Sequence, residues 1–76
     1  MNTEALQSDI LEQFAEPALV LDPQAPFRNV GSWDSLTGMA IIVMIEDKYG
    51  IQISDAEFRN LITLQDIIDL VQKKSN

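Results

Sequence analysis

The chain contains no cysteine and no histidine. Without cysteine there is no disulfide framework, and without either residue the usual ligands of zinc, copper and iron are missing. The same absence removes the Ser-His and Cys-His pairs of nucleophilic catalysis and leaves only carboxylates and lysines for acid–base chemistry. We therefore predict that the protein is not an enzyme and has no metal site, although carboxylates alone can still bind a hard cation such as calcium loosely.

Basic residues are scarce, with five Lys and Arg against twelve Asp and Glu and a net charge of −7. Such a chain repels phosphate backbones and anionic membranes and attracts basic partners. Long apolar runs are also missing, because the stretch from Ala40 to Ile45 is too short to cross a bilayer. The N-terminus carries acids and amides where a secretory signal would be basic and then apolar. We expect a cytoplasmic protein that binds neither nucleic acid nor membrane.

The 76 residues have room for one domain of marginal stability, spanning residues 1–76. Apolar spacing predicts a first helix from Thr3 to Phe14, with Thr3 as its N-cap and Pro17 beyond its end. Residues 16–33 contain all three prolines and yet many large apolar side chains, which predicts a long loop pinned onto the core. The side chains expected to pin it are Leu19, Val20, Leu21, Phe27, Val30 and Trp33.

Three more helices are indicated by their boundary signals. Asp34 is the predicted N-cap of a helix that runs to Tyr49 and stops at Gly50. A capping box at Ser54–Glu57 opens a short helix, and Thr63 starts the last one. We predict an all-α fold, a small four-helix bundle of three longer helices and one short helix. The acids of the first and last helices are expected to be solvated, and the last helix is expected to turn Leu64, Ile67, Ile68 and Val71 inward.

The helix predicted after Asp34 is apolar on two opposite sides. A bundle this small buries one such stripe, so the second is either more core beneath the long loop or an exposed docking face. We favour the docking face because this stripe begins beside Ser35. The first stripe holds Gly38, Ile41, Ile42, Ile45 and Tyr49; the second holds Leu36, Met39, Ala40 and Val43, with Asp47 at its end and Glu46 to one side.

Ser35 falls in the first turn of this helix, where backbone N–H groups lack intrahelical partners and the helix dipole favours negative charge. A phosphodiester attached to this side chain would be well placed electrostatically. On the local pattern alone, a plain first-turn serine beside the Asp34 cap is the simpler interpretation. Since no histidine is available to activate the hydroxyl, any reaction at Ser35 requires catalysis by another protein.

The tripeptide Asp34-Ser35-Leu36, which opens an acidic amphipathic helix in mid-chain, resembles the acyl carrier protein family. The similarity covers the whole chain and includes the segments at residues 49–55 and 63–66. It implies a carrier whose Ser35 bears a 4′-phosphopantetheine arm that a transferase moves from coenzyme A. The arm would hold an acyl group as a thioester for fatty acid, polyketide or specialised biosynthesis such as polysaccharide assembly.

The resemblance also implies roles for other residues. Asp34 and Leu36 would flank the attachment site and contact the phosphopantetheinyl transferase, or holo-carrier synthase. Enzymes that load and transfer acyl groups would bring basic patches to the acidic face of a monomeric carrier. The implied docking positions are Met39, Val43, Glu46 and Asp47, and those implied to line an acyl pocket in the core are Phe27, Ile41, Ile45, Tyr49, Leu61 and Ile67.

Two features depart from the common family pattern. Thr37 and Ala40 stand where fatty acid carriers commonly have acids, which implies a thinner negative docking strip, each exposed ion pair being worth up to about 1 kcal/mol. The residues before the motif, Val30-Gly31-Ser32-Trp33, lack the common Gly two positions before the Asp. A Trp directly before the motif is more similar to stand-alone carriers of specialised pathways.

Three alternatives stay open. The cargo of the carrier can be an aminoacyl group, as in peptidyl or D-alanyl carriers, and loading by a cognate adenylating ligase would reveal it. The chain can instead be an unmodified helical interaction module that binds a partner helix and loses nothing on Ser35→Ala. A carboxylate-based cation-binding protein ranks last, because no calcium-loop spacing appears among Asp9, Asp22, Asp47, Asp55 and Glu57.

Overall fold

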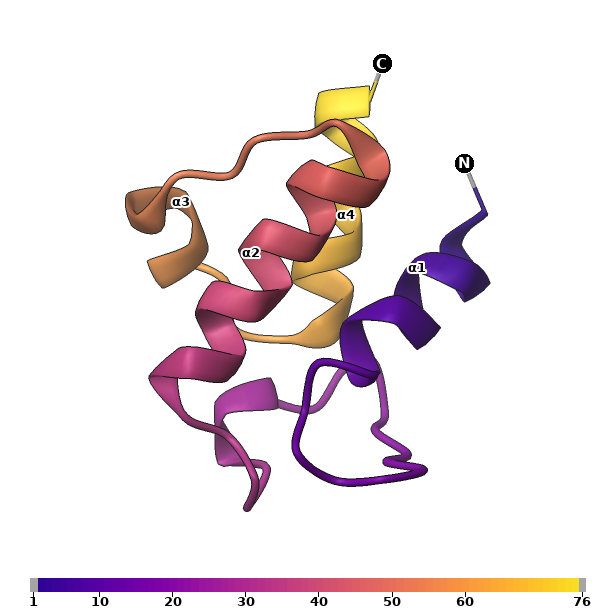
Figure 1. Ribbon diagram of the computed structural model, residues 1–76, viewed down its shortest axis with the longest axis vertical. Helices are drawn as coiled ribbons and strands as arrows, with labels where there is room; N and C mark the ends of the chain where they lie inside the picture. Colours follow the sequence, from indigo (N-terminus) through magenta and orange to yellow (C-terminus); the bar gives the residue numbers. More distant parts are fainter. Residues whose placement is uncertain (1, 76) are drawn as a thin grey trace.

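The computed structural model describes residues 2–75, which form a bundle of α-helices (Figure 1). In Figure 1, α1 lies on one side of α2 and α3 on the other, and the long segment between α1 and α2 crosses the end of the bundle opposite the two termini. Within the described residues no strand forms, and the predicted all-α fold of three longer helices and one short helix is confirmed. The elements are α1 (Thr3–Leu11), the 3₁₀ helix η1 (Phe27–Asn29), α2 (Ser35–Tyr49), α3 (Asp55–Arg59) and α4 (Leu64–Ser75).

Both ends of α1 differ from the prediction. The side chain of Asn2, and not that of Thr3, caps the helix by accepting a hydrogen bond from the N–H of Ala5 at 3.1 Å. The helix ends at Leu11, and a turn carries Phe14 into the core, where its side chain is buried. Asn is among the strongest N-cap residues, which explains the cap at Asn2. Phe14 keeps the helical spacing of the apolar residues although it lies outside the helix, because the turn after Leu11 places its side chain on the same buried side as the core residues of α1.

The boundaries of α2 confirm the prediction. Asp34 has extended backbone angles, and its carboxylate accepts the N–H of Thr37 at 2.8 Å. At the other end Gly50 takes the left-handed conformation, with φ of 68°, and its N–H bonds the carbonyl of Glu46 at 2.9 Å. Glycine adopts that conformation without the steric penalty of a Cβ, so α2 stops at Tyr49.

Reciprocal side-chain bonds start α3 and α4. Glu57 accepts the N–H of Ser54 at 3.0 Å while its own N–H bonds the Ser54 hydroxyl at 3.1 Å, which is the predicted capping box. Thr63 and Asp66 repeat the exchange at the start of α4. Because two backbone N–H groups bond its carboxylate, the pKa of Asp66 lies below its usual value, so the expectation that the acids of this helix are merely solvated is wrong for Asp66.

The long loop is pinned to the rest of the bundle, as predicted. Its Phe27 side chain is fully buried, and the Phe27 N–H bonds the carbonyl of Ile62 at 3.1 Å. A second backbone bond joins the N–H of Gln65 to the carbonyl of Pro23 at 2.9 Å. Val20 departs from the prediction, because its side chain is 90% exposed. Side chains that pack partly buried against the core are Leu19, Leu21, Val30 and Trp33.

Candidate functional site

The two sides of α2 have opposite environments. Ile41 and Ile45 are fully buried in the core. On the other side Leu36 is 71% exposed, Met39 62% and Val43 52%. The long loop therefore does not cover this second stripe, and of the two readings of its sequence pattern the exposed face is the observed one.

The other residues of α2 near this face differ in their exposure to solvent. Glu46 and Asp47 are exposed near the end of α2, whereas Ala40 is only partly exposed. Thr37 is 5% exposed, and its hydroxyl donates to the Asp34 carboxylate at 3.1 Å. Thr37 thus takes part in the N-cap and adds no charge to the outward strip.

Ser35 is the first residue of α2 and is exposed, between the exposed residues Asp34 and Leu36. Since Asp34 already bonds the N–H of Thr37, the cap fixes where the helix begins and which way the Ser35 side chain leaves it. A group attached to the hydroxyl would lie at the positive end of a helix of 15 residues. The position therefore suits a covalently held anionic group.

A small cavity of about 180 Å³ lies beside Ser35. Its walls come from α2, through Met39 and Ile42, and from α3, through Phe58. Trp33 and Arg28, both from the segment before α2, also reach it. Asp55 and Arg59 complete the lining, so the site next to the exposed hydroxyl combines apolar walls with charged side chains of both signs.

The six residues implied to line an acyl pocket belong to the core, but none of them lines either described cavity. Phe27, Ile41, Ile45 and Ile67 are fully buried, and Tyr49 and Leu61 are partly buried. Their position in the core agrees with the prediction. The cavity that adjoins Ser35 is instead lined by Met39 and Ile42 of α2 and by Phe58 of α3.

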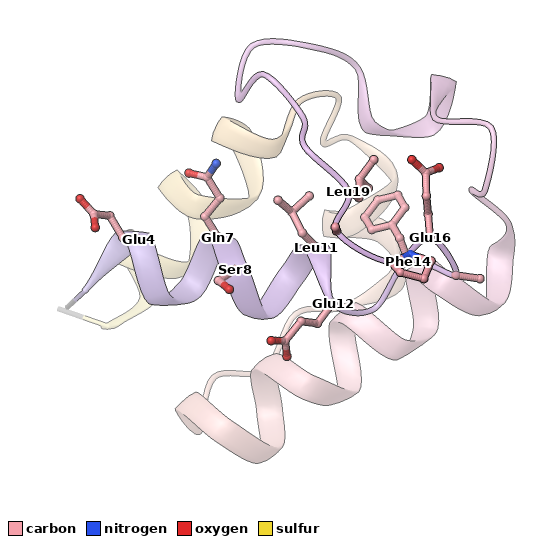
Figure 2. Close-up of a pocket in the computed structure, with 11 residues that line it drawn as sticks. Glu4, Gln7, Ser8, Leu11, Glu12, Phe14, Glu16 and Leu19 are labelled. Carbon is pink, nitrogen blue, oxygen red and sulfur yellow. The ribbon is translucent and has the colours of Figure 1, made fainter.

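A second, larger depression of about 870 Å³ lies where α1 meets the long loop (Figure 2). Leu11, Phe14 and Leu19 gather at its floor in Figure 2, and Glu4, Glu12 and Glu16 lie around them. Ala18, which also lines it, has the only positive φ, 57°, of a non-glycine residue in the described chain. None of the predicted site residues lines this depression.

A buried carboxylate joins α1 to the end of α2. Asp9 accepts the Tyr49 hydroxyl at 2.5 Å and the ammonium of Lys48 at 2.9 Å. These two bonds hold the pKa of Asp9 below its usual value, while burial first and the Asp9 bond second raise the pKa of Tyr49 to about 12. The expectation that the acids of the first helix are only solvated is therefore wrong for Asp9.

Known proteins are similar to this chain in sequence. A family model described as a phosphopantetheine attachment site matches residues 4–71. The acyl carrier protein of Thermobifida fusca is 34% identical over 67 residues, which cover 87% of this chain and 85% of that protein. This chain belongs to the acyl carrier protein family. The acyl carrier protein of Thermosynechococcus vestitus is 33% identical over 78 residues, with 90% and 94% covered.

A solved structure agrees with these relatives. The solution NMR structure of holo acyl carrier protein from Geobacter metallireducens has a TM-score of 0.79 and 32% identity, and it covers 95% of this chain and 83% of that one. As an acyl carrier protein, this chain is a carrier and not an enzyme, and its cofactor is covalent 4′-phosphopantetheine. The surroundings of Ser35 fit such a group, because the hydroxyl is exposed at a helix N-terminus and borders a cavity with apolar walls.

Residues 2–75 contain no group of three His, Cys, Asp or Glu side chains placed to hold a metal ion. In the same part of the chain no helix has both the length and the apolar character needed to cross a membrane.

Arg28 is the residue of this site that sequence reasoning missed. Its guanidinium lies over the rings of Phe27, Trp33 and Phe58 at 4.6, 5.7 and 5.5 Å from their centroids. It also donates to the carbonyls of Leu61 and Phe58, the latter at 3.0 Å. The available signal was that Arg28 is the only basic residue before Lys48 and follows a buried aromatic in a loop expected to be pinned.

Proposed function

We propose that this chain carries an acyl group as a thioester on a 4′-phosphopantetheine arm attached to Ser35, and shuttles it between enzymes of fatty acid, polyketide or specialised biosynthesis. The observation that carries the proposal is the exposed Ser35 at the start of α2, directly beside a solvent-facing apolar stripe. The terminal thiol of the arm supplies the thioester chemistry. The chain supplies the attachment point and the surface that partner enzymes bind.

Recognition by partners is assigned to the outward side of α2. Leu36, Met39 and Val43 offer a contiguous apolar contact one turn apart, and Glu46 and Asp47 extend it with negative charge. A transferase and acyl-transfer enzymes with basic patches would be steered to this face and released readily, because exposed charge pairs speed association more than they strengthen it. The interface is therefore expected to be small and salt-sensitive.

The remaining assignments follow from charge and cofactor supply. The net charge of −7 disfavours nucleic acid and anionic membranes as partners. Residues 1–76 are proposed to act as a single carrier domain and as a monomer. The proposed location is the cytoplasm, where coenzyme A is available as the donor of the arm.

The test is an intact-protein mass after incubation with coenzyme A and a broad-specificity phosphopantetheinyl transferase. The parent chain is expected to gain one phosphopantetheinyl group, and Ser35→Ala to gain none. Ser32→Ala is the matched control, because Ser32 lies three residues before Ser35 and its hydroxyl oxygen is buried. This variant is expected to be modified like the parent. An unmodified parent with several transferases would favour the interaction module.

The aminoacyl alternative is tested on the loaded carrier. Incubation of the holo-protein with adenylating ligases for amino acids and for fatty acids is expected to transfer only a fatty or related acyl group. The relatives quoted above are acyl carrier proteins, which favours this outcome. Efficient transfer of an amino acid alone would move the chain to the peptidyl or D-alanyl carriers.

A further inference from the structure

The depression between α1 and the long loop has an apolar floor that the chain leaves partly open to water (Figure 2). Phe14 is buried there, but Leu11 and Leu19 pack against the core and still remain partly exposed. Apolar surface of this kind gains free energy when another apolar surface covers it. The floor therefore suits a partner that has an apolar side.

The rim of this depression carries charge of one sign. Glu4, Glu12 and Glu16 are exposed around the floor, and no Lys or Arg of the described chain lines it. Within residues 2–75 no salt bridge reaches any of these three glutamates. Lys48 of α2 donates to Asp9 instead, at 2.9 Å. A partner that complements this rim is therefore cationic.

The C-terminal end of α1 adds to the negative potential. Its last turn contains no basic residue, and the C-cap is itself an acid, Glu12. A helix dipole places partial negative charge at this end, where basic side chains are stabilising and acidic ones are not. Glu16 follows four residues later. A cation supplied by a partner would thus offset repulsion that the chain itself leaves in place.

The acids are spread along α1 and not gathered at one point. Glu4 and Glu12 are eight residues apart, and because Glu12 still has helical backbone angles they are separated by about 12 Å along the axis. A metal ion, which holds its ligands within about 2.6 Å, does not suit such a spacing. A helix lying along α1 does, if it presents basic residues two turns apart beside an apolar stripe.

This surface is separate from the surroundings of Ser35. The described residues that line the two depressions have no member in common. In Figure 1, α1 lies on one side of α2 and α3 on the other. A partner on α1 therefore leaves Ser35 and the outer side of α2 accessible to a second protein.

We propose that the apolar floor and the three glutamates along α1 form a second docking surface, which binds a basic amphipathic helix of a partner protein. The charge of the rim, the uncapped negative end of α1 and the spacing of the acids all favour this occupant. Docking there does not depend on Ser35. It would let one protein hold the chain while another acts at the Ser35 hydroxyl.

The probe for the test is a synthetic amphipathic peptide of leucine and lysine, about 15 residues long because shorter isolated helices are marginal in water. Titrated into the isotope-labelled chain, it is expected to shift the backbone amides of residues 4–19 more than those of α2. Two matched peptides, with glutamate in place of lysine or alanine in place of leucine, should bind far more weakly. Shifts confined to α2, or equal binding by either matched peptide, would overturn the proposal.

Two pairs of substitutions locate the charge that the peptide uses. Glu4→Gln combined with Glu12→Gln should weaken binding about 4–25-fold, since each exposed ion pair contributes a factor of about 2–5. Glu46→Gln combined with Asp47→Asn removes the same charge from α2 and should weaken binding less than about twofold. Equal weakening by both pairs would mean that the peptide responds only to net charge, and the second surface would be rejected.

Modification in the presence of the peptide tests whether the two surfaces are independent. The transferase is expected to modify Ser35 at the same rate with and without saturating peptide, and Ser35→Ala should bind the peptide as the parent does. Inhibition by the peptide would place it on the outer side of α2 and contradict the proposal. Concentration-dependent shifts of the same amides without peptide would assign the surface to another copy of the chain, which contradicts it equally.

Discussion

Both sides of α2 carry large aliphatic side chains, but the environments of the two sides are opposite. The inner side places Ile41 and Ile45 in the core with no exposed surface, whereas the outer side leaves Leu36 and Met39 more than half exposed. Aliphatic character alone therefore does not decide burial in this helix. What decides it is the position of the other helices, because α1 packs against α2 on the inner side.

The comparison separates stability from recognition. Inner residues contribute to the free energy of folding through the area they remove from water. Outer residues contribute much less in the free protein, and most of their apolar area is removed from water only when a partner covers it. Substitutions on the two sides should thus affect different measurements.

The largest expected effect is on the inner side. Ile45→Ala should lower the free energy of unfolding by about 2–5 kcal/mol, because it removes a fully buried side chain and leaves a cavity. Val43→Ala, on the outer side of the same helix, should change it by less than about 0.5 kcal/mol. Urea unfolding of both variants measures the difference. Equal losses would mean that the outer side is packed against something in the free protein.

The next effect concerns binding by the outer side. Met39→Ala should weaken binding to the phosphopantetheinyl transferase by about 1–2 kcal/mol, roughly 5–30-fold, without changing the unfolding curve. Val20→Ala is the control, since Val20 is equally apolar and 90% exposed but lies in the long loop. Titration calorimetry measures both. Equal weakening by the two substitutions would break the assignment of the docking face to α2.

The sequence predicted α2 so well because its signals are local. Asp34, Gly50 and the capping box at Ser54 each act within a few residues, and all three are confirmed. The exposed serine at the helix start followed from the same cap. Contacts between segments that are distant in the sequence are harder to predict. Asp9 was mistaken for a solvated acid because its two hydrogen-bond partners are 39 and 40 residues away.

The cavity was likewise beyond the sequence. Its lining depends on how Trp33, Phe58 and Arg28 meet across the bundle, and their separation along the chain gives no periodic signal. The residues implied for an acyl pocket came from the resemblance to the family, which indicates core positions but not the space left between their side chains. Volume is a property of the packed side chains together.

The stability that Tyr49 contributes, at the C-terminal end of the inner side of α2, should fall at alkaline pH. Tyr49 keeps its phenol protonated in the folded protein, with its pKa raised from 10.0 to about 12 by burial and by Asp9. The folded pKa is the higher one, so this contribution to stability is complete below pH 10 and is lost as the pH rises from 10 to about 12. Lys48, whose pKa is raised by the same Asp9, adds to the loss at the upper end.

Urea unfolding across that pH range, compared with Tyr49→Phe, measures the effect. The parent should lose stability more steeply than the variant, which retains the ring and Lys48 but has no phenol to ionise. Parallel curves for parent and variant would show that the loss comes from Lys48 or from general repulsion alone.

The smallest expected effect lies away from both sides of α2, at the depression beside α1. Ala18→Gly should stabilise the protein by at most about 1.5 kcal/mol, because relief of a left-handed conformation is worth about 1–2 kcal/mol and the flexibility of glycine offsets about 0.5–1 kcal/mol of it. Ala56→Gly, at a right-handed helical position in α3, is the control and should destabilise the protein. Thermal melts of both variants should shift in opposite directions.

The five residues of α3 are too few to form a helix alone, since isolated helices need about 12–15 residues. Its first turn depends on Glu57, which Lys74 of α4 holds at 2.8 Å, and its last carbonyls depend on Arg28 of the loop. Amide hydrogen exchange in α3 should therefore report the breaking of these two contacts and not the melting of α3 itself. Two cations from other parts of the chain, Lys74 and Arg28, thus hold α3 in place, and a substitution at either one should speed amide exchange in α3 without changing the sequence of that helix.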